Sequence, residues 1–157
     1  MKQKFIDAYM NMVERFAQLS SAKRLQVGAI VVKEDRIISI GYNGMPSGWP
    51  NECEYKVYAN EWSIDNNHWE YQEEDGTVYN LVTKVEVIHA EMNCLGKLAK
   101  INDGADGSTM FITHSPCIEC AKGIYVAGIK KVFYRNSYKC DSGINFLKNT
   151  GVEIEKL

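Results

Sequence analysis

The amino-acid sequence predicts an α/β fold, a three-layer α/β/α sandwich built around a mixed five-stranded sheet. Short apolar runs of strand length alternate with amphipathic segments of helix length along most of the chain. Two runs near the N-terminus are close enough to form a hairpin, whereas the C-terminal half is predicted as strand, helix, strand, which implies a parallel crossover. The chain has 157 residues, 45% of them hydrophobic. We therefore predict that residues 1–157 form a single domain with a substantial core.

The N-terminal elements follow from the spacing of apolar residues. Residues 3–19 are predicted to form a helix, because five apolar side chains recur at helical spacing. Residues 27–32 and 36–41 are predicted to be strands, with Glu34 and Asp35 as the tight connection between them. The nearly continuous apolar character of both strands indicates that helices cover both faces of this hairpin. The helical stripe consists of Phe5, Tyr9, Met12, Val13 and Phe16.

The second half of the chain supplies the remaining layers. Three more strands are predicted at residues 108–113, 129–134 and 152–155, and three more helices at residues 90–99, 117–126 and 141–149. Open sheets of this kind bind ligands at the ends of their strands. We therefore expect the functional site at such an end.

A polar and aromatic segment at about residues 51–84 is predicted to be an insertion in the domain, serving as a flap or a subunit contact. Within it, Asp75-Gly76 is a turn typical of a small hairpin, residues 59–62 are predicted to form a short helix, and His68 is expected to be exposed. The aromatic residues could stack on bases or pack between subunits, and both readings stay open. They are Tyr55, Tyr58, Trp62, Trp69, Tyr71 and Tyr79.

One histidine and two cysteines are spaced for binding a metal ion. His89 and Glu91 begin a predicted helix, and Cys117 and Cys120 begin another, just after Pro116. Zn²⁺ prefers nitrogen and thiolate ligands in a tetrahedron, and a catalytic site leaves one position for water. A helix N-terminus also favours the thiolate over the thiol. We therefore predict that His89, Cys117 and Cys120 bind a catalytic Zn²⁺.

The glutamate beside these ligands suggests the reaction. His-x-Glu followed by Pro-Cys-x-x-Cys is the signature of zinc-dependent deaminases. Glu91 is too close in sequence to His89 to be a fourth ligand, so we predict that it shuttles a proton from water to a ring nitrogen before ammonia leaves. An apolar pocket would raise the pKa of its carboxyl group, which suits that role. Two alternatives remain: a redox pair of cysteines, and a structural zinc with His114 as its fourth ligand.

The loop at residues 41–50 is predicted to be a ligand loop. Its three glycines and two prolines prevent regular structure and hold a defined backbone path. Asn43 offers both a donor and an acceptor, and Gly44 and Gly48 would let a ligand approach the backbone. The simpler alternative is a surface turn.

Charge and cysteine content limit the partners. The net charge of −2 argues against a large nucleic-acid-binding surface. No apolar run is long enough to span a membrane, and the N-terminus does not resemble a signal peptide. We expect Cys53, Cys94 and Cys140 to be reduced, in a cytoplasmic protein.

Four segments together resemble the deoxycytidylate (dCMP) deaminase family of the cytidine-deaminase-like superfamily, some of whose members are viral. They are residues 27–31, 41–48, 89–93 and 115–122, and residues 128–132 continue the match, so the resemblance covers nearly the whole chain. It implies hydrolytic conversion of dCMP to dUMP and ammonia, which supplies thymidylate synthesis. The loop Gly-Tyr-Asn-Gly-x-Pro is what points to the nucleotide-monophosphate branch.

The resemblance also implies roles for several residues in substrate binding. Asn43 is expected to touch the sugar or base, Ala90 to line the substrate site, and Tyr138 to lie near the phosphate. Arg24 is our choice for the phosphate charge, ahead of Lys23, because a guanidinium matches phosphate with paired donors. An ordinary surface role for Arg24 stays open.

Regulation and assembly are likewise expectations from the resemblance. The family is typically a homohexamer, activated by dCTP with Mg²⁺ and inhibited by dTTP at a separate site, for which Gly44, Met45, Gly48 and Glu61 are the candidates. Some viral relatives hold a second, structural zinc through a cysteine in the loop after the first helix. Residues 20–23 contain no cysteine, so we predict one Zn²⁺ per subunit and an unligated Cys53.

Competing functions are distinguished by other features of the chain. A tRNA adenosine deaminase would need a basic C-terminal helix, whereas this chain ends in Glu153-Ile154-Glu155-Lys156-Leu157. A non-enzymatic zinc module would keep the ligands without needing Glu91. Deaminases of free cytidine usually have cysteine at the position of His89.

Overall fold

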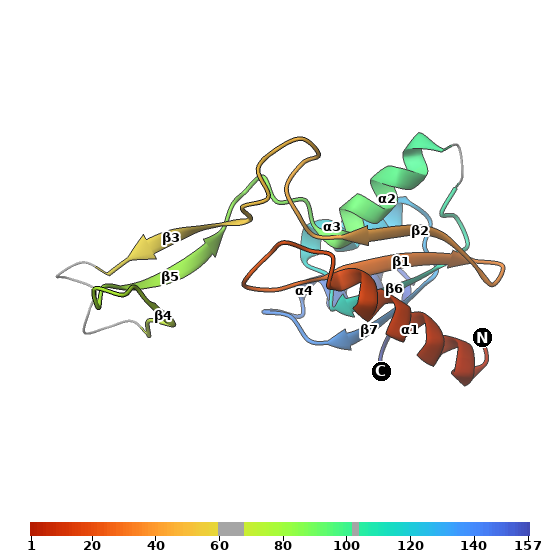
Figure 1. Ribbon diagram of the computed structural model, residues 1–157. Helices are drawn as coiled ribbons and strands as arrows, with labels where there is room; N and C mark the ends of the chain where they lie inside the picture. Colours follow the sequence, from red (N-terminus) through yellow and green to blue (C-terminus); the bar gives the residue numbers. More distant parts are fainter. Residues whose placement is uncertain (60–67, 102–103) are drawn as a thin grey trace.

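The computed structural model describes residues 1–59, 68–101 and 104–157, and it confirms the predicted α/β fold with a mixed five-stranded sheet (Figure 1). The strands of this sheet are β1 (Gly28–Lys33), β2 (Arg36–Tyr42), β6 (Thr109–His114), β7 (Lys131–Asn136) and β8 (Glu153–Lys156). The helices are α1 (Gln3–Ala17), α2 (Ala90–Lys100), α3 (Ile118–Val126) and α4 (Ser142–Asn149). The strand order is β2-β1-β6-β7-β8, antiparallel from β2 to β6 and parallel from β6 to β8.

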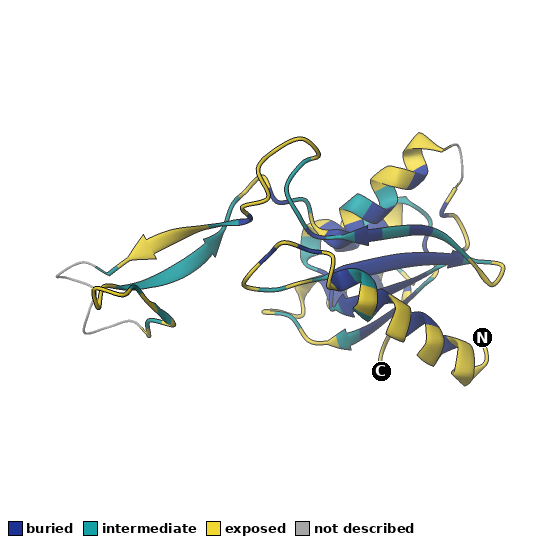
Figure 2. Cartoon of the chain, viewed as in Figure 1, coloured by how far each residue is buried: buried dark blue, intermediate teal, exposed yellow. Residues whose placement is uncertain are grey.

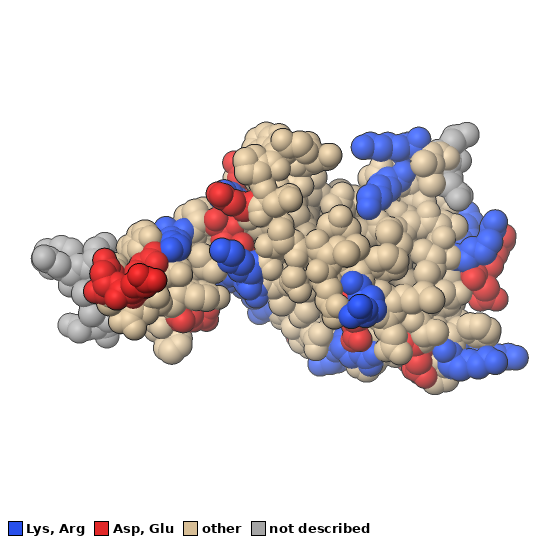
Figure 3. Space-filling view, viewed as in Figure 1, with Lys and Arg blue, Asp and Glu red and all other residues tan. Residues whose placement is uncertain are grey.

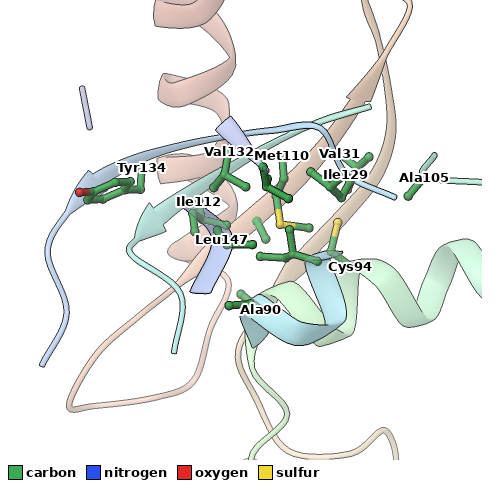
Figure 4. Packing of buried hydrophobic residues seen from close by; sticks show 14 of the residues in the cluster. Val31, Ala90, Cys94, Ala105, Met110, Ile112, Ile129, Val132, Tyr134 and Leu147 are labelled. Carbon is green, nitrogen blue, oxygen red and sulfur yellow. The ribbon is translucent and has the colours of Figure 1, made fainter. Parts of the chain in front are cut away.

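Two hydrophobic cores lie on opposite faces of this sheet. Because side chains alternate along a strand, Ile30 and Phe111 face α1, whereas Val31 and Met110 face α2, where they pack near Cys94 (Figures 2 and 4). All five side chains are fully buried, and each large one stabilises the fold by about 1.5–3 kcal/mol. The sheet is therefore the middle of three layers, and we call it, with its four helices, the body.

The hairpin of β1 and β2 turns at Glu34 and Asp35, as predicted. Both residues have positive φ angles, 50° and 59°, which the right-handed twist of a two-residue hairpin favours although neither is a glycine. The hydroxyl of Tyr9 in α1 donates to the Asp35 carbonyl at 2.8 Å and holds the turn. β1 is buried along its length, but β2 is an edge strand and only partly buried, so the predicted cover on both faces holds for β1 alone.

α2 lies unusually close to β2. A Cβ atom at Gly41 would be 2.3 Å from the Ala90 carbonyl oxygen and 2.6 Å from the Cys94 nitrogen, so only glycine allows this approach. Three side-chain hydrogen bonds fix the helix there: Ser39 to the Cys94 carbonyl at 2.7 Å, Asn93 to the Tyr42 carbonyl at 2.9 Å and Lys97 to the Ile40 carbonyl at 2.9 Å.

A second sheet, of three strands in the order β3-β5-β4, stands out from the body (Figure 1). Its strands are β3 (Glu54–Tyr58), β4 (Tyr71–Gln72) and β5 (Val78–Thr83), all paired antiparallel, and we call this sheet the arm. The Asp75-Gly76 turn joins β4 to β5 as predicted, with Gly76 at φ 90°, and His68 is exposed. The helix predicted at residues 59–62 falls largely outside the described residues.

Charge is dispersed over the face of the molecule that Figure 3 shows. On the face in Figure 3, basic and acidic side chains form small groups of both signs rather than one continuous field, in keeping with the net charge of −2. Within residues 1–59, 68–101 and 104–157, no helix is both long and apolar enough to cross a membrane.

Candidate active site

The N-termini of two helices bring the three predicted metal ligands together. His89 is the residue that precedes α2, and Cys117 is the residue that precedes α3. The His89 imidazole makes no hydrogen bond to its own helix and faces the cysteines instead. The Cys117 sulfur accepts the Cys120 backbone N–H at 3.5 Å, so the first turn of α3 places both sulfurs on one side.

The spacing of these atoms fits a tetrahedral zinc ion. His89 Nδ1 lies 3.6 Å from Cys117 Sγ and 3.4 Å from Cys120 Sγ. With Zn–S bonds of about 2.3 Å and Zn–N bonds of about 2.0–2.1 Å, a tetrahedral ion holds nitrogen and sulfur ligands about 3.5 Å apart. In the described part of the chain these three residues are the one group placed to bind a metal. His114 is not in this group, so three protein ligands leave one position free, as in catalytic zinc sites.

The two thiols are electrostatically different in the protein without metal. Hydrogen bonds from Cys120 and His89 lower the pKa of Cys117 to about 3, while the bond with Cys117 and burial raise the pKa of Cys120. The hydrogen bond with Cys117 also raises the pKa of His89. One thiolate is thus ready for a cation, and the second forms when the metal displaces the proton.

α4 fixes the backbone that carries Cys117. A Cβ atom at Gly143 would lie 2.0 Å from the Pro116 carbonyl oxygen and 2.9 Å from that of Cys117. Only glycine lets the first turn of α4 press against this segment. The position of one metal ligand therefore depends on a residue of a later helix.

Glu91 is placed for proton transfer. It lies in the first turn of α2 and is only 4% exposed. Burial raises the pKa of its carboxyl group, as predicted, because a low-dielectric environment disfavours the charged form. It lines the same pocket as His89 and Cys117, so a group bound beside the metal would meet its carboxylate.

The pocket over these residues encloses about 560 Å³ of empty space, part of it open to solvent. Ala90, Asn43 and Tyr138, all predicted to bind substrate, line it. The Tyr138 backbone N–H donates to the Ser115 hydroxyl at 2.8 Å, which fixes this part of the wall.

Asn43 shapes the pocket wall through its amide. Its Nδ2 donates to the Leu25 carbonyl at 2.9 Å, and its Oδ1 accepts the Val27 N–H at 2.8 Å. A side-chain amide has two donor hydrogens and two acceptor lone pairs, so one of each is left after these bonds. Asn43 therefore holds the approach to β1 and can still bind a ligand.

Arg24 lies at the rim of the pocket rather than on its lining. Its side chain is exposed, and Nη1 donates to the Thr83 hydroxyl of the arm at 3.1 Å. The backbone N–H groups of Lys23 and Arg24 both donate to Glu54 Oε1, at 3.0 and 3.1 Å. The loop after α1 is thus tied to the arm.

Among the polar residues of the pocket wall, Glu54 and Thr83 were not predicted from the sequence, and His114 was considered only as a ligand of a structural zinc. His114 follows the alternation of β6, in which Met110 and Ile112 face the helices that carry the site, and that pattern could have identified it. Burial lowers the pKa of its imidazole, so it lines the pocket as a neutral group near pH 7. Glu54 and Thr83 carry no local signal, because their neighbours across the pocket are distant in sequence.

Three of the residues proposed for regulation line a second pocket, which shares Asn43 with the first. Gly44, Met45 and Gly48 form one side of it, and Lys97 and Asn93 of α2 lie on another. Gly44 pairs with Ile88 through two backbone hydrogen bonds of 2.9 and 3.1 Å, so this loop is tied to the segment that leads to His89. Glu61, the fourth candidate, lies outside the described residues.

Known proteins resemble this chain over most of its length. The family model of the cytidine and deoxycytidylate deaminase zinc-binding region matches residues 3–136. The deoxycytidylate deaminase of Enterobacteria phage T4 is 31% identical over 159 residues, covering 88% of this chain and 82% of that protein. The human deoxycytidylate deaminase is 36% identical, covering 80% of this chain and 61% of that protein.

A solved structure agrees with both the fold and the sequence. The crystal structure of the dCMP deaminase from the cyanophage S-TIM5, in complex with dCMP and dUMP, matches with a TM-score of 0.81 and 44% identity, covering 100% of this chain and 99% of that chain. Since the family model also spans both helix starts that carry the metal ligands, the chain belongs to the family of cytidine and deoxycytidylate deaminases.

Proposed function

We propose that this protein catalyses the zinc-dependent hydrolysis of dCMP to dUMP and ammonia. The observation that carries the proposal is that His89, Cys117 and Cys120 form a three-ligand zinc site in one pocket with the buried Glu91. The 44% identity to a cyanophage enzyme described with dCMP and dUMP supports this choice of substrate.

The chain's own residues supply the proton transfers. When bound, Zn²⁺ supplies Lewis-acid activation of water near neutral pH. The Glu91 carboxylate accepts a proton from the attacking water and delivers it to the ring nitrogen next to the amino-bearing carbon. It then helps to protonate the amino group, which leaves as ammonia while the carbonyl of dUMP forms. The raised pKa of Glu91 makes it a better proton donor at pH 7 than an ordinary carboxylate.

Other residues in and beside the pocket would bind the sugar, base and phosphate of a nucleotide monophosphate. Asn43 has a donor and an acceptor left for the sugar or base, and Ala90 forms an apolar part of the lining. Tyr138 lies on the wall and Arg24 at the rim, where they meet the phosphate. A guanidinium offers the paired donors that phosphate oxygens accept.

An ammonia-release assay over dCMP, CMP, deoxycytidine, dCTP and a tRNA anticodon hairpin tests the substrate. The proposal expects the highest kcat/KM for dCMP and a marked loss for deoxycytidine, which lacks the phosphate. A preference for the hairpin would instead indicate a tRNA deaminase. No ammonia from any substrate by zinc-loaded protein would favour a non-enzymatic zinc module.

Regulation forms a second part of the proposal: a homohexamer activated by dCTP with Mg²⁺ and inhibited by dTTP. Its support is the family resemblance together with the pocket formed by Gly44, Met45 and Gly48, where Lys97 offers a positive charge. dCMP saturation curves with and without dCTP should differ in sigmoidicity, and light scattering should give the mass of six chains. Superimposable curves would remove the allosteric claim.

We also propose one Zn²⁺ per subunit, in a cytoplasmic enzyme. The Cys53 sulfur lies 3.5 Å from the Ser21 hydroxyl. The loop after α1 therefore places a serine beside Cys53, where a second zinc would need a cysteine from this loop. All five cysteines are free thiols, as expected in a reducing compartment. Elemental analysis should give one zinc per chain, and two would contradict this proposal.

A further inference from the structure

The base of the arm forms part of the active-site pocket. Glu54 of β3 and Thr83 of β5 lie directly opposite each other in the antiparallel register, and both line the pocket that contains His89 and Glu91. Every other strand residue of the arm lies farther along the sheet, away from this wall. The insertion therefore reaches the site through one cross-strand pair.

The side chain of Glu54 binds the backbone of the loop after α1. A single carboxylate oxygen, Oε1, accepts the N–H groups of both Lys23 and Arg24, at 3.0 and 3.1 Å. Hydrogen bonds from backbone N–H to a carboxylate are charge-assisted and stronger than neutral ones. Ala22 and Leu25, on either side of these two residues, also line the pocket, so Glu54 fixes a segment of the wall.

Thr83 holds the other end of Arg24. Its hydroxyl accepts a hydrogen bond from Nη1 at 3.1 Å, so the arm holds Arg24 at its backbone and at its tip. A guanidinium has five N–H donors, and within residues 1–59, 68–101 and 104–157 the other four make no hydrogen bond to the protein. An exposed arginine normally samples many rotamers, and restraining it beforehand reduces the entropy lost on binding.

We infer that Glu54 is a positioning residue for substrate binding, which acts through Arg24 and sets the place of the guanidinium for the phosphate of the nucleotide. The inference rests on the proposed function. Direct contact of Glu54 with the phosphate is disfavoured, because both groups are negative and Oε1 is already engaged. The arm thereby contributes to recognition of the monophosphate, while the body supplies the chemistry.

A double-mutant cycle with Arg24 tests this role. Glu54→Ala should raise KM for dCMP about tenfold, as expected for a lost charge-assisted interaction, and should leave kcat within about twofold. Glu54→Gln keeps the accepting oxygen and should stay within about threefold of wild type. In the Arg24→Ala background, Glu54→Ala should change KM less than about twofold, because coupled residues are not additive.

Calorimetry on zinc-loaded protein gives a readout that is independent of turnover. Glu54→Ala should weaken binding of dUMP about tenfold and of deoxyuridine less than about twofold, since only dUMP carries the phosphate. Thr83→Val, which removes the acceptor for Arg24 at nearly constant shape, should act in the same direction with a smaller effect. Glu52→Ala is the matched control, because Glu52 is an exposed acid two residues away that pairs with Lys84 instead.

Three results would overturn the inference. These are an undiminished effect of Glu54→Ala in the Arg24→Ala background, equal weakening of dUMP and deoxyuridine, and a loss in kcat alone. Zinc content and thermal unfolding of each variant separate local effects from misfolding, and Glu54→Gln covers the case in which the alanine variant does not fold. If wild-type protein does not deaminate dCMP, the proposed function fails instead, whatever the variants do.

Discussion

The body and the arm of this molecule each contain a β-sheet, but the two sheets are stabilised in different ways. In the body, helices cover both faces, and side chains such as Val31 and Phe111 are completely buried. In the described strands of the arm, by contrast, no residue is buried: Glu54, Tyr71 and the residues of β5 are intermediate, and the others are exposed (Figure 2). Tyr55 and Tyr58 of β3 are 49% and 48% exposed.

Surface interactions within the arm replace the missing core. Tyr71 stacks on Tyr79 with ring centroids 5.4 Å apart, and Lys56 lies over the Tyr79 ring at 4.4 Å while pairing with Glu73. Exposed ion pairs and cation–π contacts contribute at most about 1 kcal/mol each. A small sheet of this kind needs additional packing for independent stability.

This difference suits the body to the proposed chemistry and the base of the arm to the proposed recognition of the phosphate. Zinc binding and proton transfer require atoms held to within fractions of an ångström, and the residues proposed for both lie at the starts of helices packed on the sheet of the body. Recognition of a flexible phosphate tolerates more motion, and its proposed groups lie where the arm meets the body.

The largest effect is expected in the body, at Glu91. Glu91→Gln keeps the shape of the side chain but removes the group that accepts the proton, so kcat for dCMP should fall by about 10²–10⁴-fold. Zinc content, measured by atomic absorption, should stay at one per chain, because Glu91 is not a ligand. A variant that retains full turnover would end the assignment of Glu91 as the proton shuttle.

A smaller effect, on stability, should separate the two sheets. Gly143→Ala places a Cβ against the Pro116 carbonyl and should reduce the free energy of unfolding by about 1–3 kcal/mol, with weaker zinc binding because Cys117 is displaced. Val57→Ala on the arm, where the side chain is 39% exposed, should cost about 0.5 kcal/mol or less.

Urea denaturation of both metal-free variants checks these values, and zinc titration checks the displacement of Cys117. Equal destabilisation by the two substitutions would mean that the arm is packed as firmly as the body. A partner surface would then have to cover the arm.

The smallest effect concerns pH. Burial raises the pKa of Glu91 above its value of about 4.3 in the unfolded chain, so its favourable contribution is present below pH 4.3 and is lost as pH rises through the folded-state pKa. Glutamine does not titrate. The Tm of metal-free Glu91→Gln should therefore exceed that of wild type more at pH 8 than at pH 4, and a difference independent of pH would contradict the assigned burial effect.

Local sequence patterns were enough to predict the fold of the body and the three side chains that meet there as a candidate metal site. His89, Glu91, Cys117 and Cys120 follow directly from their spacing at two helix starts, and the structure brings the three ligands together. Strand ends were displaced by one or two residues. β7, for example, begins at Lys131 rather than 129, because α3 ends in a turn with Gly128 at φ 80°.

The arm's share of the pocket could not be predicted in the same way. Glu54 is 30 residues from Arg24, and Thr83 is 59 residues from it. Contacts over such separations depend on the three-dimensional path of the arm, and the polar, aromatic composition of residues 51–84 does not specify that path. The same holds for Gly143, whose role depends on the approach of α4 to Pro116.

The most direct test of the account is a zinc titration of metal-free protein with dCMP turnover as the readout. Ammonia release should rise linearly with added Zn²⁺ and level off at one equivalent per chain, and a Cys120→Ser variant should show neither tight binding nor turnover. Full activity in rigorously metal-free protein, or saturation with zinc without any conversion of dCMP, would contradict it.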